Sequence, residues 1–316
     1  MKNLLYPVVL LTSVIAISCS DGDDQPDNSI KPVLWSKSSL TSNADVTSIA
    51  ISGSTIFVGT FGEGLFRSTD KGKSWEAVNS GLSNNMIMSL CISGDNIFAG
   101  TNGDGIFRST NNGDTWSSVN NGLSVLGLSY RGLITNGSDL FAATGGGLFV
   151  SHNNGSSWEA ITNGPDEHSV DCLGSSADRI FMWNNVSEGY VTSDNAASWT
   201  DANNGLMNQY VTSFFGGSNR HLVGTQSGDV FFSTDNGGEW KQSTNLEHAP
   251  IPSITGDATN NLYAGTAGRG VLVSKDQGAT WTKANDGLGD LYVSVVAYGA
   301  GQLLAGTNEG LFVSDH

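Results

Sequence analysis

The sequence predicts an all-β fold, namely a single seven-bladed β-propeller whose blades are four-stranded antiparallel sheets. The first observation behind this prediction is a tryptophan that recurs at intervals of 40, 41, 42, 41, 41 and 41 residues. A repeat of about 40–45 residues is what one propeller blade needs. Seven such units account for residues 32–316, which we expect to form one domain. The tryptophans of this series are Trp35, Trp75, Trp116, Trp158, Trp199, Trp240 and Trp281.

The second observation is hydrophobic alternation with a period of two, which is typical of strands. In the first unit we expect strands over residues 46–51, 56–58, 65–68 and 75–78, separated by turns rich in glycine and serine. The later units repeat this order. We therefore expect sheet throughout the domain and no helix after the N-terminal leader.

The third observation is that the two chain ends complement each other. The last unit stops at residues 314–316, before its fourth strand, whereas residues 33–35 supply a tryptophan-containing strand that no unit precedes. Pairing of the N-terminal strand with the three C-terminal ones would close the ring and leave no open edge between the first and last blades.

A short motif, S-x-D-x-G-x-x-W, occurs in six copies, and each copy ends in one of the seven tryptophans. An Asp or Asn side chain at its third position can accept hydrogen bonds from the backbone a few residues later, and glycine supplies a positive φ. We expect these residues to hold structural turns and to bind no metal, because no copy has the spaced oxygen ligands of a calcium loop. The motif residues are Asp70, Asn111, Asn153, Asp194, Asp235 and Asp276, with Trp75, Trp116, Trp158, Trp199, Trp240 and Trp281.

On these six copies the chain resembles the Asp-box, or BNR-repeat, β-propellers. Sialidases, sortilin-like receptors, xyloglucan-cleaving glycosidases and photosystem II assembly factors carry the same motif. The resemblance covers residues 35–316 and implies the propeller fold. It implies no single function, since these relatives do unrelated things.

The N-terminus has the features of a bacterial lipoprotein signal. Lys2 precedes an apolar run from Leu4 to Ile17, which is too short to span a bilayer comfortably, and Cys19 follows. We expect residues 1–18 to be removed and Cys19 to be lipidated. The residues before Cys19 depart from the usual Leu-Ala-Gly pattern, so an ordinary secretory signal cleaved nearby is the alternative.

Residues 19–31 are acidic and contain a proline, a composition that cannot bury a core, so we expect a flexible tether. An acidic run directly after the lipidated cysteine resembles a surface-export signal of some Gram-negative bacteria. The predicted location is therefore the outer membrane, exposed at the cell surface, with the periplasmic face as the alternative. Acyl chains would be the only membrane contact.

Charge and cysteine usage exclude several classes of partner and site. The formal net charge is −16 and no cluster of Lys and Arg occurs, which disfavours nucleic acid and anionic glycans. Cys91 and Cys172 fall in different, non-adjacent units, so we expect buried free thiols. Neither a metal-ligand spacing nor a phosphate loop is present, and no cofactor is expected.

Ligands of propellers usually bind on the face formed by the loops between the second and third strands and by the blade-to-blade connections. The connections of this face also carry Asp166, His168, His248 and Tyr292. We expect its candidate binding residues to be Phe61, Glu63, Asp104, Arg131, Trp183, Glu188, Tyr210, Asp229, Arg269 and Glu309.

The resemblance to sialidases can be tested on arginines, because that family holds its substrate carboxylate with three of them. Only Arg131 and Arg269 are expected near the binding face, whereas Arg67, Arg108, Arg179 and Arg220 are not. Sialidase activity is therefore disfavoured. A hydrolase of neutral polysaccharide needs only two carboxylates, about 5–5.5 Å or about 6.5–9.5 Å apart. Its candidates would be Glu63, Asp104 and Glu188.

The leading hypothesis is a non-catalytic, lipid-anchored propeller that binds a protein or a glycan, with the neutral-glycan hydrolase as its rival. A purely structural role in a cell-envelope complex is a third possibility. We expect a monomer. Trp183, which lies outside the tryptophan series, has two interpretations, as a core residue or as an exposed binding anchor.

Overall fold

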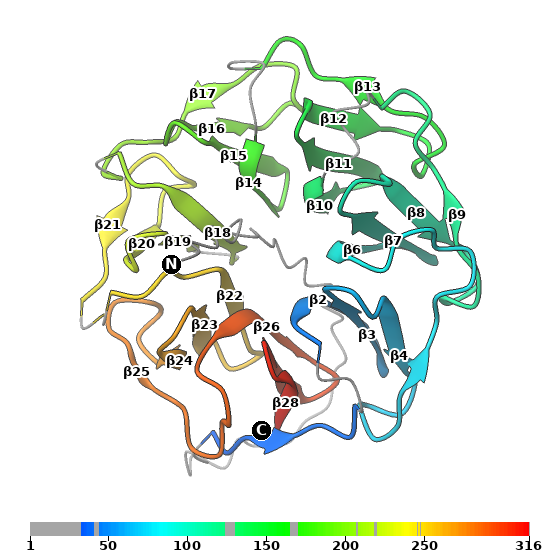
Figure 1. Ribbon diagram of the computed structural model, residues 1–316. Helices are drawn as coiled ribbons and strands as arrows, with labels where there is room; N and C mark the ends of the chain where they lie inside the picture. The colour runs from blue at the N-terminus through cyan, green and yellow to red at the C-terminus, as the bar shows by residue number, and fades with distance from the viewer. Residues whose placement is uncertain are drawn as a thin grey trace, which may run out of the picture.

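The structure is a ring of sheets around a central axis, and the prediction of a seven-bladed propeller is confirmed (Figure 1). The computed structural model describes residues 33–40, 44–123, 130–164, 170–206, 208–217, 220–244, 246 and 248–315. This described part contains 28 strands in seven four-stranded antiparallel sheets and no helix. The predicted leader and tether, with Cys19, lie outside it.

Each of the first six blades is built from four consecutive strands, and the innermost strand comes first. Blade 1 consists of β2 (Val46–Ser52), β3 (Thr55–Thr60), β4 (Leu65–Ser68) and β5 (Glu76–Ala77). Blade 2 consists of β6 (Ile87–Ser93), β7 (Asn96–Thr101), β8 (Ile106–Ser109) and β9 (Ser117–Ser118). Blade 3 consists of β10 (Tyr130–Asn136), β11 (Asp139–Thr144), β12 (Gly147–Ser151) and β13 (Glu159–Ala160).

The next three blades follow the same plan. Blade 4 consists of β14 (Val170–Ser176), β15 (Arg179–Asn184), β16 (Gly189–Thr192) and β17 (Thr200–Asp201). Blade 5 consists of β18 (Val211–Gly216), β19 (His221–Thr225), β20 (Val230–Ser233) and β21 (Lys241–Gln242). Blade 6 consists of β22 (Ser253–Gly256), β23 (Leu262–Thr266), β24 (Gly270–Ser274) and β25 (Thr282–Lys283).

Blade 7 joins the two ends of the chain, as predicted. Its inner strands are β26 (Val293–Gly299), β27 (Gln302–Thr307) and β28 (Gly310–Asp315), and its outer strand is β1 (Ser36–Lys37). The closing strand thus begins directly after Trp35 rather than over residues 33–35. In Figure 1 the blue first strand runs beside the red β28 near the C-terminus.

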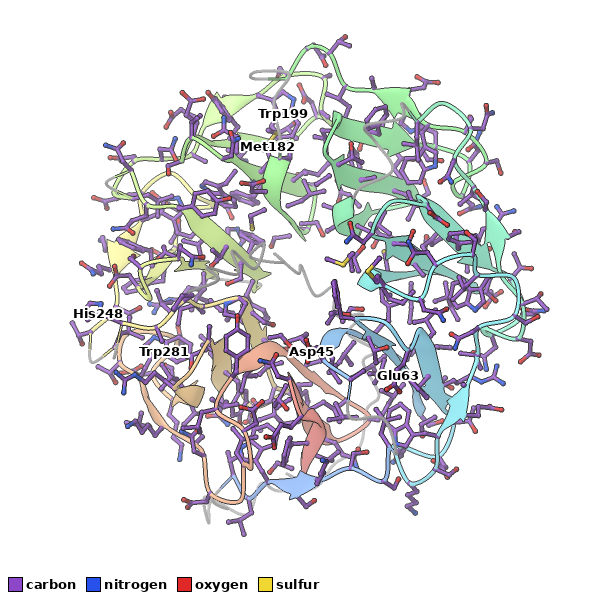
Figure 2. The ribbon with its side chains drawn as sticks, in the orientation of Figure 1. Asp45, Glu63, Met182, Trp199, His248 and Trp281 are labelled. Carbon is purple, nitrogen blue, oxygen red and sulfur yellow. The ribbon has the colours of Figure 1, made fainter. Side chains whose placement is uncertain are left out.

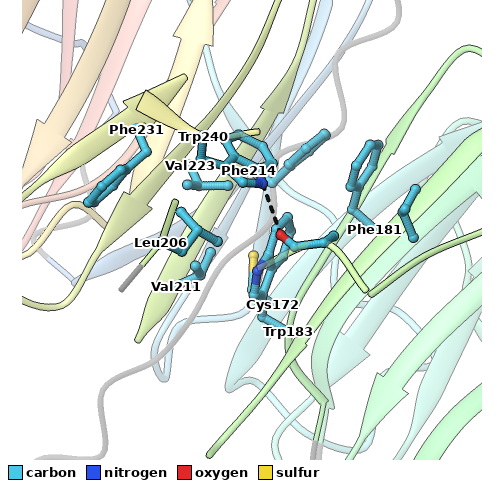
Figure 3. Close-up of a cluster of buried hydrophobic side chains, with 11 residues drawn as sticks. Cys172, Phe181, Trp183, Leu206, Val211, Phe214, Val223, Phe231 and Trp240 are labelled. Atoms are coloured by element: carbon cyan, nitrogen blue, oxygen red, sulfur yellow. Dashed lines mark hydrogen bonds between the residues drawn. The ribbon is translucent and has the colours of Figure 1, made fainter. Parts of the chain in front are cut away.

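The hydrophobic core lies between neighbouring blades. One cluster of buried side chains joins Phe57 and Leu65 of blade 1 to Ile87 and Leu90 of blade 2. Similar clusters recur around the ring, and the one between blades 4 and 5 is shown in Figure 3. Because each sheet packs both faces against its neighbours, consecutive residues of the inner strands are buried rather than only alternate ones.

The turn between the third and fourth strands has the same hydrogen bonds in all six motif copies. In the first copy, the Ser68 hydroxyl donates to Asp70 Oδ1 at 2.8 Å and accepts the Gly72 N–H at 2.7 Å. Asp70 Oδ1 also accepts the Ser74 N–H at 2.9 Å. In the other five copies the hydroxyl of the first residue donates to the Asp or Asn, whose oxygen in turn accepts the N–H four residues on.

Three of the motif tryptophans, Trp116, Trp158 and Trp240, donate a hydrogen bond from the indole to a carbonyl of the preceding blade. Trp116 Nε1 donates to the Val78 carbonyl at 2.8 Å, and Trp158 makes the same bond to Val119. The backbone of each of these tryptophans lies so close to the preceding blade-to-blade connection that the connection needs a glycine at the contact. At Gly205 φ is +93°, and a Cβ would stand 2.1 Å from the Trp240 carbonyl oxygen. The same crowding recurs at Gly81, Gly122 and Gly287.

The prediction of buried free thiols is confirmed. Cys91 and Cys172 are free and buried, and burial raises the pKa of the Cys91 thiol to about 12. In the described part of the chain, no helix is long and apolar enough to span a membrane.

The turn carboxylates make stability depend on pH in the acid range. The Ser74 hydroxyl and N–H lower the pKa of Asp70 from 3.8 to about 2, and Ser198 does the same for Asp194. A carboxyl whose pKa is lower in the folded than in the unfolded chain stabilises the fold fully at pH values above its unfolded-state pKa. This stabilisation is lost as the pH falls toward the folded-state pKa of about 2. We expect the variant Asp70→Asn/Asp194→Asn to lose less stability than the native chain between about pH 4 and pH 2.

Urea unfolding at a series of pH values measures this effect. Asparagine should keep the turns intact, because Asn111 and Asn153 already accept the same N–H bonds in blades 2 and 3. An unchanged acid slope in the double variant would contradict the assignment.

Candidate binding face

The candidate binding residues lie on one face of the ring, which we call the loop face. It comprises the loops between the second and third strands of each blade and the blade-to-blade connections. Since consecutive strands are antiparallel, the hairpins between the first and second strands and the motif turns lie on the opposite face, which we call the hairpin face. The described blade-to-blade connections cross the viewer's side of Figure 1.

Asparagines of the blade-to-blade connections fix several of the loops. Asn79 Oδ1 accepts the Leu65 N–H at 2.7 Å, and its amide donates to the Glu63 carbonyl. Asn120 and Asn285 make the same pair of bonds to the loops of Asp104 and Arg269. Backbone bonds also join loop to connection, for example from the Gly62 N–H to the Asn85 carbonyl. The loops are therefore held as rigid supports for their side chains.

The three candidate catalytic carboxylates lie in blades 1, 2 and 4 and have different surroundings. Glu63 is exposed, and Figure 2 shows it farther from the axis than Asp45. Asp104 is half-buried and accepts a hydrogen bond from the Ser83 hydroxyl. Glu188 is half-buried, and its Oε2 accepts from the Asn184 amide at 3.0 Å and the Tyr190 hydroxyl at 3.2 Å. No described contact joins these carboxylates to one another.

Asp229 and Tyr210 are held by neighbours rather than presented freely. The Asp229 carboxylate is buried and accepts from Ser227 at 2.9 Å and from the Gln242 amide at 3.0 Å. His248 Nδ1 stands 3.5 Å from the same carboxylate, and this imidazole is exposed. The Tyr210 hydroxyl donates to Asp171 of the innermost strand of blade 4, which joins blades 4 and 5.

The remaining candidates are exposed or fall outside the described residues. Phe61, Arg269, Glu309 and Tyr292 are all exposed on the loop face. The backbone of Arg131 lies in β10 at the bulge between Tyr130 and Gly132, but its side chain is outside the described part, as are Asp166 and His168.

Trp183 requires a correction, because it is not part of the accessible face. Its side chain is fully buried between blades 4 and 5, stacked on Phe181 with ring centroids 6.1 Å apart and edge-on to Trp240 at 6.0 Å (Figure 3). A fully buried ring cannot serve as an exposed anchor. Of the two interpretations of Trp183, the core role is the one that its environment allows.

The arginines that we expected to lie away from the binding face are on the hairpin face or in third strands. Arg67 forms ion pairs with Glu76 at 2.8 Å and with Asp114 at 2.7 Å, which links blade 1 to the motif turn of blade 2. Arg108 donates to the Asn154 carbonyl at 2.8 Å, and Arg220 donates to the Gln277 carbonyl. These three side chains therefore tie each blade to the next turn on the hairpin face. Among the described residues, no group of three or more His, Cys, Asp or Glu is arranged to hold a metal ion.

Sequence reasoning missed four residues of the loop face, Asp45, Asp171, Asp290 and Leu291. Asp171 could have been noticed because a carboxylate interrupts an apolar inner strand. Asp45, Asp290 and Leu291 lie in connections of the kind that looks like ordinary polar loop in sequence. Only the ring brings Asp45 close enough to Asp290 for their charges to interact.

The Asp45 carboxyl is affected by burial and by a neighbouring charge. Partial desolvation, and then the charge of Asp290, raise the pKa of the Asp45 carboxyl above its ordinary value, although much of the side chain is exposed. Asp290 Oδ1 accepts the Tyr292 N–H at 2.9 Å, whereas its Oδ2 is buried with no hydrogen-bond partner in the described part of the chain. Figure 2 shows Asp45 on the inner side of the ring, near its axis.

Comparison with known proteins supports the fold. A family model described as the DUF6242 β-propeller domain matches residues 140–253. A comparison with curated protein sequences finds no match.

Solved structures resemble the whole ring. YCF48 from Cyanidioschyzon merolae superposes with a TM-score of 0.71 and 13% identity over 90% of this chain and 98% of that one. A structure of YCF48 bound to a D1 peptide gives 0.73 and 15% over 92% and 99%.

Two larger proteins contain a similar propeller. The extracellular domain of a one-component system from B. thetaiotaomicron gives a TM-score of 0.75 and 17% identity, and the GH74 xyloglucanase from Xanthomonas campestris gives 0.69 and 15%. The match covers 90% and 89% of this chain, but only 40% and 53% of those proteins. At these identities the likeness concerns the fold alone.

Proposed function

We propose that this protein is a non-catalytic, lipid-anchored propeller that binds a polypeptide partner on its loop face. One observation carries the proposal. Of the five large apolar side chains exposed in the described part, four lie on the loop face, namely Phe61, Val186, Leu291 and Tyr292. Apolar side chains that gather on one face of a soluble domain mark an interaction surface.

The likeness to YCF48 adds support, because one of its structures holds a bound D1 peptide. The rigid loops pinned by Asn79, Asn120 and Asn285 suit a preformed docking surface, since little loop entropy is lost on binding. The separate surroundings of Glu63, Asp104 and Glu188 give no reason to pair any two of them as acid and base.

Binding and turnover assays on the full chain test this proposal. The chain is immobilised and offered a random 12-residue peptide library, and separately incubated with a panel of neutral and sialylated polysaccharides. We expect selective peptide retention and no released sugar. Sugar release that disappears in Glu63→Gln or Asp104→Asn would favour the hydrolase and overturn the proposal, as would the absence of any retained peptide.

The anchoring part rests on the sequence of residues 1–31. The mass of the N-terminal peptide from membrane-extracted protein tests it. We expect a chain that begins with an acylated Cys19, and an unmodified N-terminus at another residue would remove the lipid anchor from the proposal.

A further inference from the structure

Three of the exposed apolar side chains and two carboxylates lie in neighbouring loops and connections of the loop face, from the connection between blades 6 and 7 to the loop of blade 1. We call Phe61, Leu291, Tyr292, Asp45 and Asp290 the acidic-apolar patch. Hydrogen bonds join neighbouring members, and the Ser294 hydroxyl of blade 7 donates to the Val46 carbonyl of blade 1, next to Asp45. The Phe61 N–H donates to the Asp45 carbonyl at 2.9 Å, and the Tyr292 N–H donates to the Asp290 carboxylate.

The patch rests on a rigid base. The Leu291 carbonyl accepts the N–H groups of Gly268 and Gly270 at 3.0 and 2.8 Å, and Tyr292 forms a β-bridge with Ala267. These bonds tie the connection between blades 6 and 7 to the loop of blade 6. The side chains are therefore held outward by ordered backbone, and the exposure of Phe61, Leu291 and Tyr292 at 41%, 45% and 46% belongs to a fixed surface.

The charges of the patch favour a cation. The carboxylates of Asp45 and Asp290 repel each other, and the Oδ2 atom of Asp290 lacks a donor within the described residues. Glu309 and Glu63 extend from the loops of blades 7 and 1, Arg269 is the cation on the loop of blade 6, and the whole chain carries a formal charge of −16. A lysine or arginine that pairs with the exposed Asp45 carboxylate would offset the repulsion between the two carboxylates.

The apolar members of the patch favour a polypeptide over a sugar. A sugar ring stacks on flat aromatic faces, which Leu291 lacks, whereas an apolar side chain of a polypeptide can pack on aliphatic and aromatic members alike. A neutral glycan could hydrogen-bond to the carboxylates but carries no charge to offset the repulsion between Asp45 and Asp290, whereas a Lys or Arg side chain does. Both features fit a segment in which a basic residue stands next to an apolar one.

We propose that the acidic-apolar patch binds an extended polypeptide segment of a partner protein, with a Lys or Arg placed over Asp45 and Asp290 and an adjacent apolar side chain packed on Leu291, Tyr292 and Phe61. This inference rests on the proposed function and narrows it to one part of the loop face and one class of partner sequence.

Matched synthetic peptides test the inference on the full chain. The first peptide carries Arg-Leu pairs, the second replaces each Arg with Glu, and the third replaces each Leu with Ser. Fluorescence anisotropy gives the Kd of each peptide at low and high salt. We expect the first peptide to bind at least about ten-fold more tightly than the others, and its binding to weaken with salt.

Variants then place the binding. Asp45→Asn/Asp290→Asn and Leu291→Ser/Tyr292→Ser should each weaken the Arg-Leu peptide about ten-fold while the melting temperature is kept. An asparagine at position 290 can still accept the Tyr292 N–H, so the connection should hold its shape. Two controls should bind normally, Leu34→Ser, an exposed apolar residue outside the loop face, and Asp95→Asn/Asp178→Asn, an equal charge change on the hairpin face. Val186→Ser shows whether the peptide also uses blade 4 of the loop face.

The outcomes separate this inference from the proposed function. Peptides that bind but respond to Val186→Ser and not to the patch variants would keep a polypeptide platform and overturn the patch. Equal affinity for the Arg and Glu peptides would contradict the proposal that a Lys or Arg of the partner binds at Asp45 and Asp290. A neutral oligosaccharide that displaces the Arg-Leu peptide and loses affinity in the patch variants would show that the patch is a glycan site.

Discussion

Replacing Trp183 with alanine is expected to lower the free energy of unfolding by about 3–5 kcal/mol. The side chain is fully buried and contacts Phe181, Phe214 and Trp240 across blades 4 and 5. Its removal leaves a cavity that neighbouring sheets, held by their own ladders, cannot collapse to fill. Because the indole of Trp183 is inaccessible to a partner, peptide binding by the folded variant should be unchanged.

Blade 4 has room for Trp183 because the sizes of two paired residues are exchanged relative to the other blades. In blade 4 the large residue is on the second strand and the small one is on the third. Trp183 pairs with Gly189 in the register of β15 and β16. The equivalent pairs elsewhere have the reverse sizes, with a small residue on the second strand and a large one on the third. Examples are Gly59 with Leu65 and Gly100 with Ile106. A Cβ on Gly189 would lie 2.1 Å from Trp183 Nε1.

The size exchange makes the prediction testable with a double-mutant cycle. Gly189→Leu alone should be severely destabilising through overpacking, whereas Trp183→Gly/Gly189→Leu restores the arrangement of the other blades and should recover most of the loss. We expect a coupling of about 1–3 kcal/mol from urea unfolding. Trp183→Phe is the conservative control, since Nε1 has no hydrogen-bond partner in the described structure. Additive single effects would contradict the exchange.

Trp35→Ala is expected to have a comparably large effect, because this residue closes the ring. Its side chain is 5% exposed, Nε1 donates to the Ala284 carbonyl at 2.6 Å, and its N–H donates to the Asp286 carbonyl at 2.8 Å. The strand that follows, β1, pairs with β28 over only two residues. The closure therefore depends on the tryptophan more than on the ladder, and we expect a loss of about 3–5 kcal/mol.

The neighbouring residue provides the control for ring closure. Leu34 is 59% exposed, so Leu34→Ala should change the unfolding free energy by less than about 0.5 kcal/mol. Hydrogen exchange should also show faster opening of β26, β27 and β28 in Trp35→Ala than in the native chain. Equal stability of the two variants would mean that the N-terminal segment does not close the ring.

Residue spacing was sufficient to predict the ring and its closure, and the local reason is visible in the turns. The hydroxyl and carboxylate of Ser68 and Asp70 bond within six residues, so the motif specifies its turn without help from distant residues. The tryptophan period then sets the number of blades. Packing between blades requires only that each unit repeat the same apolar positions, which a single sequence displays.

Site geometry was predicted less well, because it depends on contacts between units. The sequence placed Glu63, Asp104 and Arg269 on loops of one face, but it did not distinguish the exposed Glu63 from the buried Asp229. The fate of Trp183 depended on Gly189 six residues later, a pairing that appears only when strand register is known.

The amino-acid sequence by itself thus determined the fold class, the number of blades and the face that carries the candidate loops, because these follow from local turns repeated at a constant period. Only the tertiary structure decided which side chains are accessible and which carboxylates meet. Asp45 and Asp290 are separated by most of the chain and come together because the ring closes through blade 7. Their interaction depends on distance in space, which no local pattern encodes.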